Sequence, residues 1–238
     1  MAPFGDALRA FAEGDTDAEL FMHRDDGLSV SLPARHFFRP PSEFTRLETL
    51  ALGRCAGRVL DCGAGAGPHS LVLQERGLSV TAIDLSREAV EVMTRRGVRD
   101  ARHADVASFR GGPFDTVLLL GHTIGLVETV DGLDAFLHGL QALVADGGQV
   151  VLDSVDVRAT DDPVNLAYHE VNRRTGRYVG EIRDALEFRG VKGPVHGWLQ
   201  VDEETLAEHA ARAGWSCEVL LTEPNGEALF RLSRGTSA

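Results

Sequence analysis

Cysteine is scarce in this chain, and its placement excludes two kinds of site. The 238 residues include only three cysteines, Cys55, Cys62 and Cys217, and no two of them form a Cys-x-x-Cys pair. An odd and scattered set of this kind is neither a disulfide framework nor a structural zinc site. The histidines lack metal-ligand spacing as well. We therefore expect the protein to hold no metal ion.

Long hydrophobic runs and excess basic charge are also absent. No apolar stretch approaches the roughly 20 residues that span a bilayer, and the N-terminus lacks the apolar segment of a signal peptide. The 24 lysines and arginines are outnumbered by 36 aspartates and glutamates, which gives a net charge of −12. Unspecific binding to nucleic acid needs a basic surface instead. The sequence therefore predicts a soluble, cytoplasmic protein that does not bind membranes, and it disfavours nucleic acid as a partner.

A glycine-rich turn follows the first predicted strand, residues 57–60. It reads Asp61-Cys62-Gly63-Ala64-Gly65-Ala66-Gly67-Pro68, and a helical pattern begins at the proline. Glycines at alternate positions let the backbone turn sharply and let a ligand approach without meeting a Cβ atom. The N–H groups at the start of the helix face whatever lies over the turn. This arrangement is typical of a nucleotide-type cofactor site at the carboxyl end of a strand.

The acid before the glycines distinguishes between cofactors. A dinucleotide fingerprint has the spacing G-x-G-x-x-G, whereas Gly63, Gly65 and Gly67 follow G-x-G-x-G. Asp61 stands two residues before the first glycine, where a carboxylate repels a diphosphate but accepts a hydrogen bond from an ammonium group. The turn therefore favours a cofactor that is cationic where it meets the protein.

Two further acids follow the next two predicted strands. Asp84 ends the strand at 79–83, about 20 residues after the first glycine, where an acid can bind both hydroxyls of a ribose. Asp105 follows a short third strand, and its carboxylate could accept a hydrogen bond from an adenine amino group. The order of the acids and the turn predicts one cofactor site at the carboxyl ends of three strands.

This series of motifs resembles the class I S-adenosylmethionine-dependent methyltransferases, in particular small bacterial single-domain members. The resemblance covers most of the chain from Val59 to the C-terminus. It implies S-adenosyl-L-methionine as methyl donor and S-adenosyl-L-homocysteine as product, but it does not identify the methyl acceptor. The cofactor-binding residues that it implies are Asp61, Gly63, Ala64, Gly65, Gly67, Asp84, Leu85, Asp105, Val106, Gly121 and His122.

Strand and helix patterns alternate along the chain, which predicts an α/β fold with a doubly wound, mainly parallel sheet. The strand at 114–120 is continuously apolar, as expected of a central strand covered on both faces. A helical stripe runs from Leu133 to Val144 and is followed by a fifth strand at 149–154. The resemblance implies seven strands, the last of them antiparallel.

An added β-hairpin, or lid, is predicted after the fifth strand, because the alternation breaks down there. The predicted organisation is an N-terminal helical cap segment at 1–56 and a methyltransferase domain at 57–238, with 156–201 as the added lid or hairpin insertion.

His122, at the end of the fourth strand, is the candidate for acid–base catalysis. The unperturbed pKa of histidine as a residue type lies near working pH, so a histidine here could take a proton from a hydroxyl, thiol or amine as the methyl group arrives. Alternatively it only shapes the pocket or contacts the cofactor, since alignment of the reactants can supply much of the rate without a base. Many amine-methylating members of the family carry Asn/Asp-Pro-Pro-Tyr here. The sequence Gly-His-Thr-Ile at 121–124 weighs against their adenine or glutamine N-methylation.

Substrate contacts are predicted in two regions. By resemblance, the N-terminal segment folds over the cofactor, so Phe38 and Arg39 could touch the ligand; alternatively the phenylalanine only fixes the segment to the core. His69 opens the first helix after the turn, and we favour an exposed position for it over a ligand contact. The remaining candidates end the fifth strand or lie in the added region: Asp153, Tyr168 and Tyr178.

Four functions are compatible with these motifs. The favoured one is methyl transfer to an O, N or S atom of a small molecule, because the chain is acidic, small and carries a predicted lid. The second is an NAD-dependent oxidoreductase, which the glycine spacing and Asp61 oppose. The third is a non-catalytic cofactor-binding protein on the same scaffold. The fourth is a protein or RNA methyltransferase; the added region has no basic and aromatic pattern that favours RNA, and protein substrates stay open. We expect a monomer or a homodimer.

Overall fold

The computed structural model describes residues 2–234, and its main sheet confirms the predicted α/β fold. The sheet has seven strands in the order β11-β12-β7-β6-β3-β4-β5. The pairs β3–β4, β4–β5 and β6–β7 are parallel, whereas β12 is antiparallel to both of its neighbours. The strands are β3 (Arg58–Cys62), β4 (Ser79–Asp84), β5 (Ala101–His103), β6 (Phe114–Leu119), β7 (Val144–Val155), β11 (Trp215–Thr222) and β12 (Glu227–Arg234).

The chain divides into two compact units, which are described separately. The first consists of Met1–Arg110 and Asp184–His196, and the second of Gly111–Arg183 and Gly197–Ala238. The predicted boundary at 56/57 and the insertion at 156–201 stay predictions.

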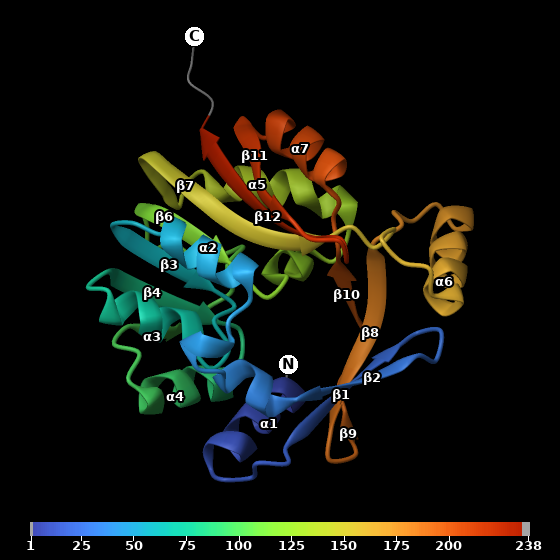
Figure 1. Cartoon of the computed structure of the whole chain (residues 1–238), viewed down its shortest axis with the longest axis horizontal. Helices are drawn as coiled ribbons and strands as arrows, with labels where there is room; N and C mark the ends of the chain where they lie inside the picture. The colour runs from blue at the N-terminus through green and yellow to red at the C-terminus, as the bar shows by residue number, and fades with distance from the viewer. Residues whose placement is uncertain (1, 235–238) are drawn as a thin grey trace. The chain divides into compact units, whose positions relative to one another are not determined.

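Helices cover the strands of the first unit (Figure 1), and their ends follow the sequence signals. They are α1 (Ala2–Ala12), α2 (Arg46–Arg54), α3 (Pro68–Glu75) and α4 (Arg87–Arg96). The Ser86 hydroxyl caps α4 by accepting the Ala89 N–H, and the helix ends at the left-handed Gly97. α1 packs against α4. At Gly67, which has φ +76°, an added Cβ would lie 2.8 Å from Val98 Cγ2, so the turn before α3 can lie this close to the residues at the end of α4 only through a glycine.

An unpredicted hairpin lies in the N-terminal segment. Strands β1 (Glu19–Arg24) and β2 (Ser29–Pro33) pair antiparallel, and two 3₁₀ helices follow, η1 (Ala34–Phe38) and η2 (Pro41–Glu43). The signal was present, because Asp26-Gly27 between two apolar stretches is a strong hairpin turn sequence. β1 also pairs antiparallel with β8 (Glu181–Phe188), from Leu20 opposite Phe188 to Arg24 opposite Asp184.

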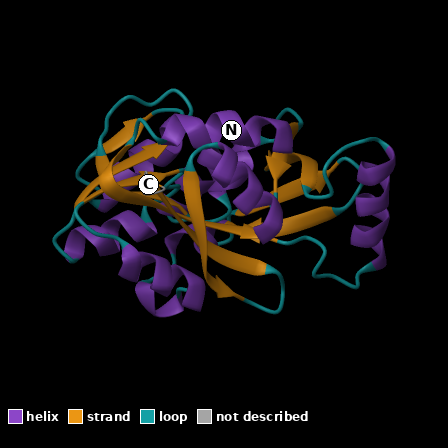
Figure 2. Ribbon diagram, turned by 90° about the horizontal axis from the view of Figure 1, so that it is seen from above, coloured by secondary structure: helices purple, strands orange, loops and turns teal. Residues whose placement is uncertain are grey.

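The region after β7 forms the predicted hairpin addition. It contains α6 (Pro163–Arg174), β8, β9 (Val191–Lys192) and β10 (His196–Leu199). These strands join β1 and β2 in a second sheet of order β10-β8-β1-β2, with β9 paired to β8. Figure 2 shows α6 as a helix joined to the strands by loops at both ends.

The second unit corrects one element boundary. The helical stripe predicted from Leu133 to Val144 ends earlier, because α5 is Leu133–Leu140 and β7 already begins at Val144. The Leu143 carbonyl accepts the Phe114 N–H at 2.7 Å, and Val144 pairs with Phe114 at the start of β6. Apolar residues at this point therefore belong to the sheet, which periodicity alone could not distinguish from a helix.

The remaining elements of the second unit surround β6 and β7. They are η3 (Thr123–Val127), η4 (Val130–Gly132) and α7 (Glu203–Arg212), which packs beside α5. Asp202 caps α7 as expected, and its carboxylate accepts the Thr205 N–H. Val117 to Leu119 and Val150 to Leu152 are fully buried, as befits strands covered on both faces. No helix among residues 2–234 is long and apolar enough to cross a membrane.

Candidate functional site

The glycine turn of the first unit is held by the acid at the end of β4. The Gly65 N–H donates to Asp84 Oδ2 at 2.9 Å, and the Ser86 N–H donates to Oδ1 at 2.8 Å. Gly63, Gly65 and Gly67 all have positive φ, between 57° and 76°, a conformation that costs a side-chain-bearing residue energy. The structure thus brings together two predicted cofactor residues that are 19 positions apart.

A second buried acid lies beside the same turn. Asp61 is the penultimate residue of β3, and its Oδ2 accepts a hydrogen bond from Ser70 Oγ at 2.6 Å. Burial raises the pKa of the Asp61 carboxyl, against the charge of His69 and the Ser70 hydrogen bonds. Burial also raises the pKa of Asp84 to about 6; hydrogen bonds from Ser86 and Gly65 oppose this, and the charge of Asp61 adds to it. The two carboxyls therefore share a site that would bind a cationic group favourably.

His69 is not the exposed residue that the sequence favoured. Its Nε2 lies 2.8 Å from Glu48 Oε1, and the Arg39 guanidinium donates to the same oxygen at 2.9 Å. The Thr45 N–H donates to the other carboxylate oxygen of Glu48, as part of a capping box at α2. Burial raises the pKa of Glu48, but these hydrogen bonds and the charges of His69 and Arg39 outweigh it, so that the pKa is about 2.

The Glu48 network gives Arg39 a defined place. Besides Glu48, its guanidinium donates to the backbone carbonyls of His36 and Glu43. The network thus ties the segment after η1 to the start of α3. Glu48 itself was missed from the sequence; the pattern Thr45-x-x-Glu48 before an apolar run is the capping-box signal that marks it.

Aromatic rings of the N-terminal segment lie against the glycine turn. An added Cβ at Gly65 would be 3.7 Å from both Phe37 and Phe4, and these two rings meet edge to face at 5.0 Å. Phe38 instead packs on Phe11 at 4.6 Å, beneath the Arg96 guanidinium. Phe38 is therefore used in packing within the unit, and its contact with a ligand stays a prediction.

The remaining predicted cofactor residues of this unit differ in exposure. Leu85, directly after Asp84, is 45% exposed, an unusual state for a leucine beside a buried acid. Asp105 is exposed, and its Oδ1 accepts the Ala107 N–H at 2.9 Å, which shapes the turn after β5. Ala64 and Val106 are buried. An apolar surface next to acidic acceptors suits a flat heterocyclic ring with amino and hydroxyl groups.

The second unit carries a corresponding acid and turn. Asp153, in β7, is buried, and its Oδ1 and Oδ2 accept the N–H groups of His122 at 2.8 Å and Gly121 at 3.2 Å. His122 has φ 58° and ψ 30°, the left-handed region that a histidine seldom occupies. Its Nε2 lies 4.0 Å from Asp153 Oδ2. The structure thus joins three predicted site residues into one cluster.

A tryptophan fixes the segment that follows His122. The Trp198 ring packs directly on the backbone of Gly125 in η3, where an added Cβ would come within 2.3 Å of the ring. An added Cβ at Gly197 would lie 2.7 Å from Glu128 Cβ, and Glu128 itself has a positive φ of 68°. Contacts with β10 therefore hold the end of η3 in place. The sequence around Gly125 has no local pattern that predicts its contact with Trp198.

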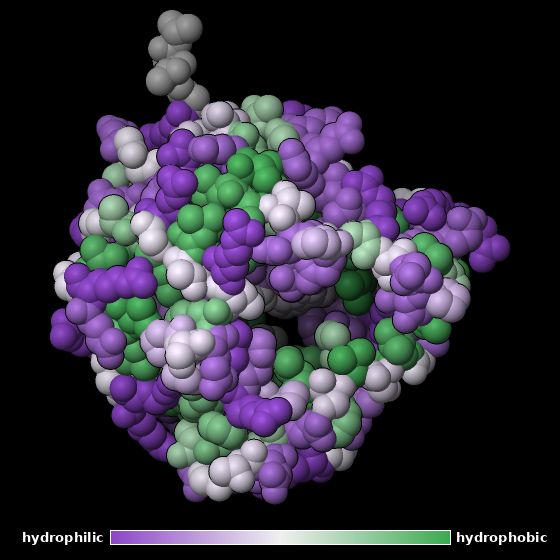
Figure 3. Space-filling model, viewed as in Figure 1, coloured by the Kyte–Doolittle hydropathy of each residue, from purple (hydrophilic) through white to green (hydrophobic). Residues whose placement is uncertain are grey.

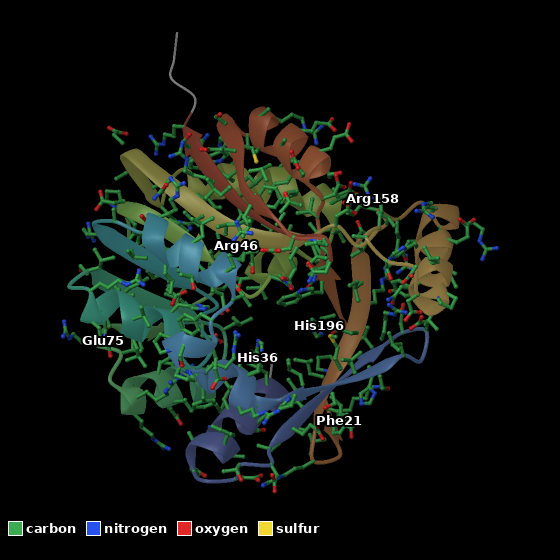
Figure 4. The ribbon with its side chains drawn as sticks, viewed as in Figure 1. Phe21, His36, Arg46, Glu75, Arg158 and His196 are labelled. Carbon is green, nitrogen blue, oxygen red and sulfur yellow. The ribbon has the colours of Figure 1, made fainter. Side chains whose placement is uncertain are left out.

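The two predicted tyrosines make hydrogen bonds inside the second unit. The Tyr168 hydroxyl accepts the Arg183 N–H at 3.1 Å, and the ring is buried. The Tyr178 hydroxyl donates to Asp202, and burial together with this hydrogen bond raises its pKa to about 12. Arg158, in the loop before α6 (Figure 4), lies 3.3 Å from the same carboxylate. Both hydroxyls support the fold, and their contact with substrate stays a prediction.

Metal ligation is not indicated in the described part of the chain. Among residues 2–234, no group of three or more histidine, cysteine, aspartate or glutamate side chains could hold a metal ion.

Comparison with known proteins agrees with the fold. A family model of the methyltransferase domain matches residues 34–220. The solved structure of an S-adenosylmethionine-dependent methyltransferase from Bacteroides fragilis, in complex with S-adenosyl-L-homocysteine, has 30% sequence identity and a TM-score of 0.86; the match covers 98% of this chain and 94% of that one. The chain belongs to the methyltransferase domain family, and its fold is that of the class I S-adenosylmethionine-dependent enzymes.

Two relatives whose names state an activity match a smaller part of this chain. The demethylmenaquinone methyltransferase of Clavibacter sepedonicus is 36% identical over 178 residues, which is 71% of this chain and 69% of the relative. The cypemycin N-terminal methyltransferase of a Streptomyces species is 30% identical over 118 residues, or 46% of this chain. The chain spans about half the length of this second relative, 48%.

Proposed function

We propose that this protein transfers a methyl group from S-adenosylmethionine to an O, N or S atom of a small molecule. The observation that carries the proposal is the pair of buried acids at the glycine turn, Asp61 and Asp84, of which Asp84 holds the turn itself. Family membership and the likeness to a methyltransferase crystallised with S-adenosyl-L-homocysteine support it. When bound, this cofactor supplies a methyl group activated by a positively charged sulfur.

The residues present fit this cofactor in charge and shape. Burial raises the pKa of both carboxyls, and the charge of Asp61 adds to the rise at Asp84, so an ammonium group bound there would stabilise their charged forms. Each oxygen of Asp84 accepts one backbone N–H and keeps a second lone pair, which can accept from a ribose hydroxyl. The left-handed glycines let a ligand approach the turn closely, and the exposed Leu85 offers an apolar surface for adenine.

The Asp153 cluster is proposed to serve the methyl acceptor. Asp153 fixes the backbone at Gly121 and His122, which orients the imidazole. A histidine held this way can accept the proton of a hydroxyl, thiol or amine as that atom is methylated. If the acceptor loses its proton to water, His122 would only position the acceptor, and the alignment of the reactants would supply the rate.

Calorimetric titration with S-adenosyl-L-homocysteine, beside NADH as a matched control, tests the cofactor. We expect micromolar binding of the first and no heat from the second. Binding of NADH alone would favour the oxidoreductase. The same titration should be repeated with the variant Asp61→Asn, because the carboxamide keeps the size of the side chain while it removes the charge offered to an ammonium group.

Methyl transfer is then measured with isotopically labelled cofactor against a panel of acceptors. Demethylmenaquinone and a short peptide with a free N-terminus open the panel, because relatives are named for these substrates; small phenols, amines and thiols complete it. Transfer to one chemical class identifies the acceptor atom. Tight cofactor binding with no transfer to any acceptor would favour a non-catalytic cofactor-binding protein.

A further inference from the structure

A segment of the first unit lies against the glycine turn. It consists of residues 34–45, which connect β2 to α2 and contain the two short 3₁₀ helices η1 and η2. We call this segment the strap. An added Cβ at Gly65 would be 3.7 Å from the Phe37 ring. A ligand that approaches the Gly65 backbone therefore lies beside the strap.

A second aromatic ring links the strap to the same turn through an arginine. The Phe38 ring lies 4.7 Å from the Arg96 guanidinium, and Arg96 Nη1 donates to the Ala66 carbonyl at 2.6 Å. Arg35 and His36 of the strap, by contrast, are exposed. On the face drawn in Figure 3, hydrophilic residues lie beside hydrophobic ones at the surface. The strap therefore contacts the turn on one side and water on the other.

The backbone of the strap is anchored at its two ends. The Ala34 N–H donates to the Ala18 carbonyl at 2.9 Å at one end, and Thr45 caps α2 at the other. Between them, 3₁₀ helices have poorer hydrogen-bond geometry than α-helices, and Pro40 and Pro41 have no N–H to donate. Side-chain contacts are therefore needed to hold the middle of the strap.

The buried carboxylate of Glu48 makes such a contact. Its Oε1 accepts a hydrogen bond from the Arg39 guanidinium at 2.9 Å and lies 2.8 Å from Nε2 of His69, in the first turn of α3. Arg39 also donates to the carbonyls of His36 and Glu43, which lie on either side of it in the strap. Glu48 therefore joins the middle of the strap to the helix that begins directly after the glycine turn.

The burial of this network makes the Glu48 charge important. The side chains of Glu48, His69 and Arg39 are only 8%, 13% and 19% exposed. Removing one partner of a buried ion pair costs far more than removing one at the surface, because the remaining charge stays buried and unpaired. Without the carboxylate, Arg39 would be more stable in water, and the strap would have to move to bring it there.

We propose that Glu48 is a positioning residue for the cofactor: through Arg39 it holds the strap against the glycine turn, and it thereby slows the release of bound S-adenosyl-L-homocysteine. The inference rests on the proposed function, since this ligand must occupy the turn. A ligand beside Phe37 leaves faster when the strap opens more often. Segments that cover a site in this way set the rate of product release in many enzymes.

Glu48→Gln is the test variant, because glutamine still completes a capping box with Thr45 but offers no charge to Arg39 and His69. In the ligand-free full chain, amide hydrogen exchange of the strap should become at least about tenfold faster, while that of β3 and β4 stays unchanged. Glu75→Gln is the matched control. Glu75 is an exposed acid at the end of α3 (Figure 4), so its substitution changes the net charge equally, and its strap should exchange like that of wild type.

Surface plasmon resonance with S-adenosyl-L-homocysteine then measures association and dissociation separately. Glu48→Gln and Arg39→Gln should each raise the dissociation rate constant by about tenfold and change the association rate constant by less than about threefold. The double variant should dissociate no faster than either single variant, because both substitutions remove the same contact. A purely structural role would lower the melting temperature without this non-additive change in dissociation.

Three results would overturn the proposal. They are unchanged strap exchange in Glu48→Gln, a dissociation rate constant equal to that of Glu75→Gln, and effects of Glu48→Gln and Arg39→Gln that multiply in the double variant. Failure of the proposed function gives a different result, because wild type would then bind no S-adenosyl-L-homocysteine although strap exchange still responds to Glu48→Gln. In that case Glu48 holds the strap but has no role in releasing this ligand.

Discussion

Each unit of the molecule contains a buried aspartate that fixes a turn through two backbone N–H groups. In the first unit Asp84 binds Gly65 and Ser86, and in the second Asp153 binds Gly121 and His122. Both turns contain a left-handed residue with nearly the same φ, 57° at Gly65 and 58° at His122. A left-handed residue beside a buried aspartate therefore occurs once as a glycine and once as a histidine.

The difference indicates what each turn is for. Glycine occupies the left-handed region at no cost and leaves the space above the backbone open, which suits a turn that a ligand must approach. Histidine in the same region is strained by roughly 1 kcal/mol or more, so its side chain must compensate by doing something that glycine cannot. We therefore propose that the first turn serves ligand binding and that the second presents a functional group. This contrast is a hypothesis that mutation can test.

The largest expected effect comes from removing the two aspartates in turn. Asp84→Ala should weaken S-adenosyl-L-homocysteine binding by about 100-fold, close to 3 kcal/mol, because both the ribose acceptor and the support of the Gly65 turn are lost. Asp153→Ala should leave this affinity nearly unchanged and lower kcat by about tenfold, because it releases His122. Calorimetry and single-turnover rates measure the two quantities separately.

Asp84→Asn serves as control for the first substitution, because it keeps the side-chain shape and one of the two backbone hydrogen bonds. It should fall between wild type and Asp84→Ala in affinity. Equal effects of Asp84→Ala and Asp153→Ala on cofactor affinity would remove the proposed division between a binding turn and a catalytic one.

A smaller effect is expected in the pH dependence of stability. The folded pKa of Asp84 is about 6, raised from 3.8 chiefly by burial. A carboxyl with a raised folded pKa contributes stability that is fully present below pH 3.8 and is lost as pH rises through about 6. The stability of wild type relative to Asp84→Asn should therefore fall by about 2 kcal/mol between pH 4 and pH 7.

Urea unfolding at a series of pH values gives this difference, in which titrations common to both proteins cancel. Saturating S-adenosyl-L-homocysteine should reduce the slope, because hydroxyl donors favour the carboxylate and lower its pKa. A difference that stays constant with pH would mean that the Asp84 carboxylate is not destabilised by burial, and the binding turn would lose its electrostatic basis.

Much of the first turn was predictable from sequence because its signals are local. The G-x-G-x-G spacing, Pro68 at the first helical position and the Ser86 cap each lie within a few residues of the structure that they specify. Asp84 was predictable as well, because a strand pattern ended on it. Its hydrogen bond to Gly65 was not, since only the parallel pairing of β3 and β4 brings them together.

The rest depended on contacts between distant segments. The contact of Asp153 with substrate stays a prediction, but its hydrogen bonds to a turn 31 and 32 positions earlier had no sequence signal. Burial of Glu48 required Arg39 and His69 from two other segments. The hairpin β1–β2 had a local signal that was overlooked, and the start of β7 was mistaken for helix because Val144 continues the apolar spacing. The spacing of apolar residues along the sequence does not predict these contacts between distant segments.

The smallest and most specific effect concerns the backbone of His122. His122→Gly should be more stable than His122→Ala by about 1 kcal/mol, because alanine keeps the left-handed strain that glycine lacks. Gly65→Ala should show the same penalty of about 1 kcal/mol, since a Cβ there meets Phe37 and Phe4 only at the ordinary contact distance of 3.7 Å and backbone strain is the main cost.

Chemical denaturation of the three variants gives the stabilities, and methyl transfer gives the function. If the imidazole acts on the acceptor, His122→Gly and His122→Ala lose turnover to the same extent even though one backbone is relaxed and the other strained. If the histidine instead only holds the turn, glycine should restore turnover that alanine lacks, because the relaxed backbone still donates its N–H groups to Asp153. The comparison between His122→Gly and His122→Ala therefore separates the two roles. Equal loss of turnover in both variants means that the imidazole acts on the acceptor, whereas turnover that follows stability means that His122 only holds the turn.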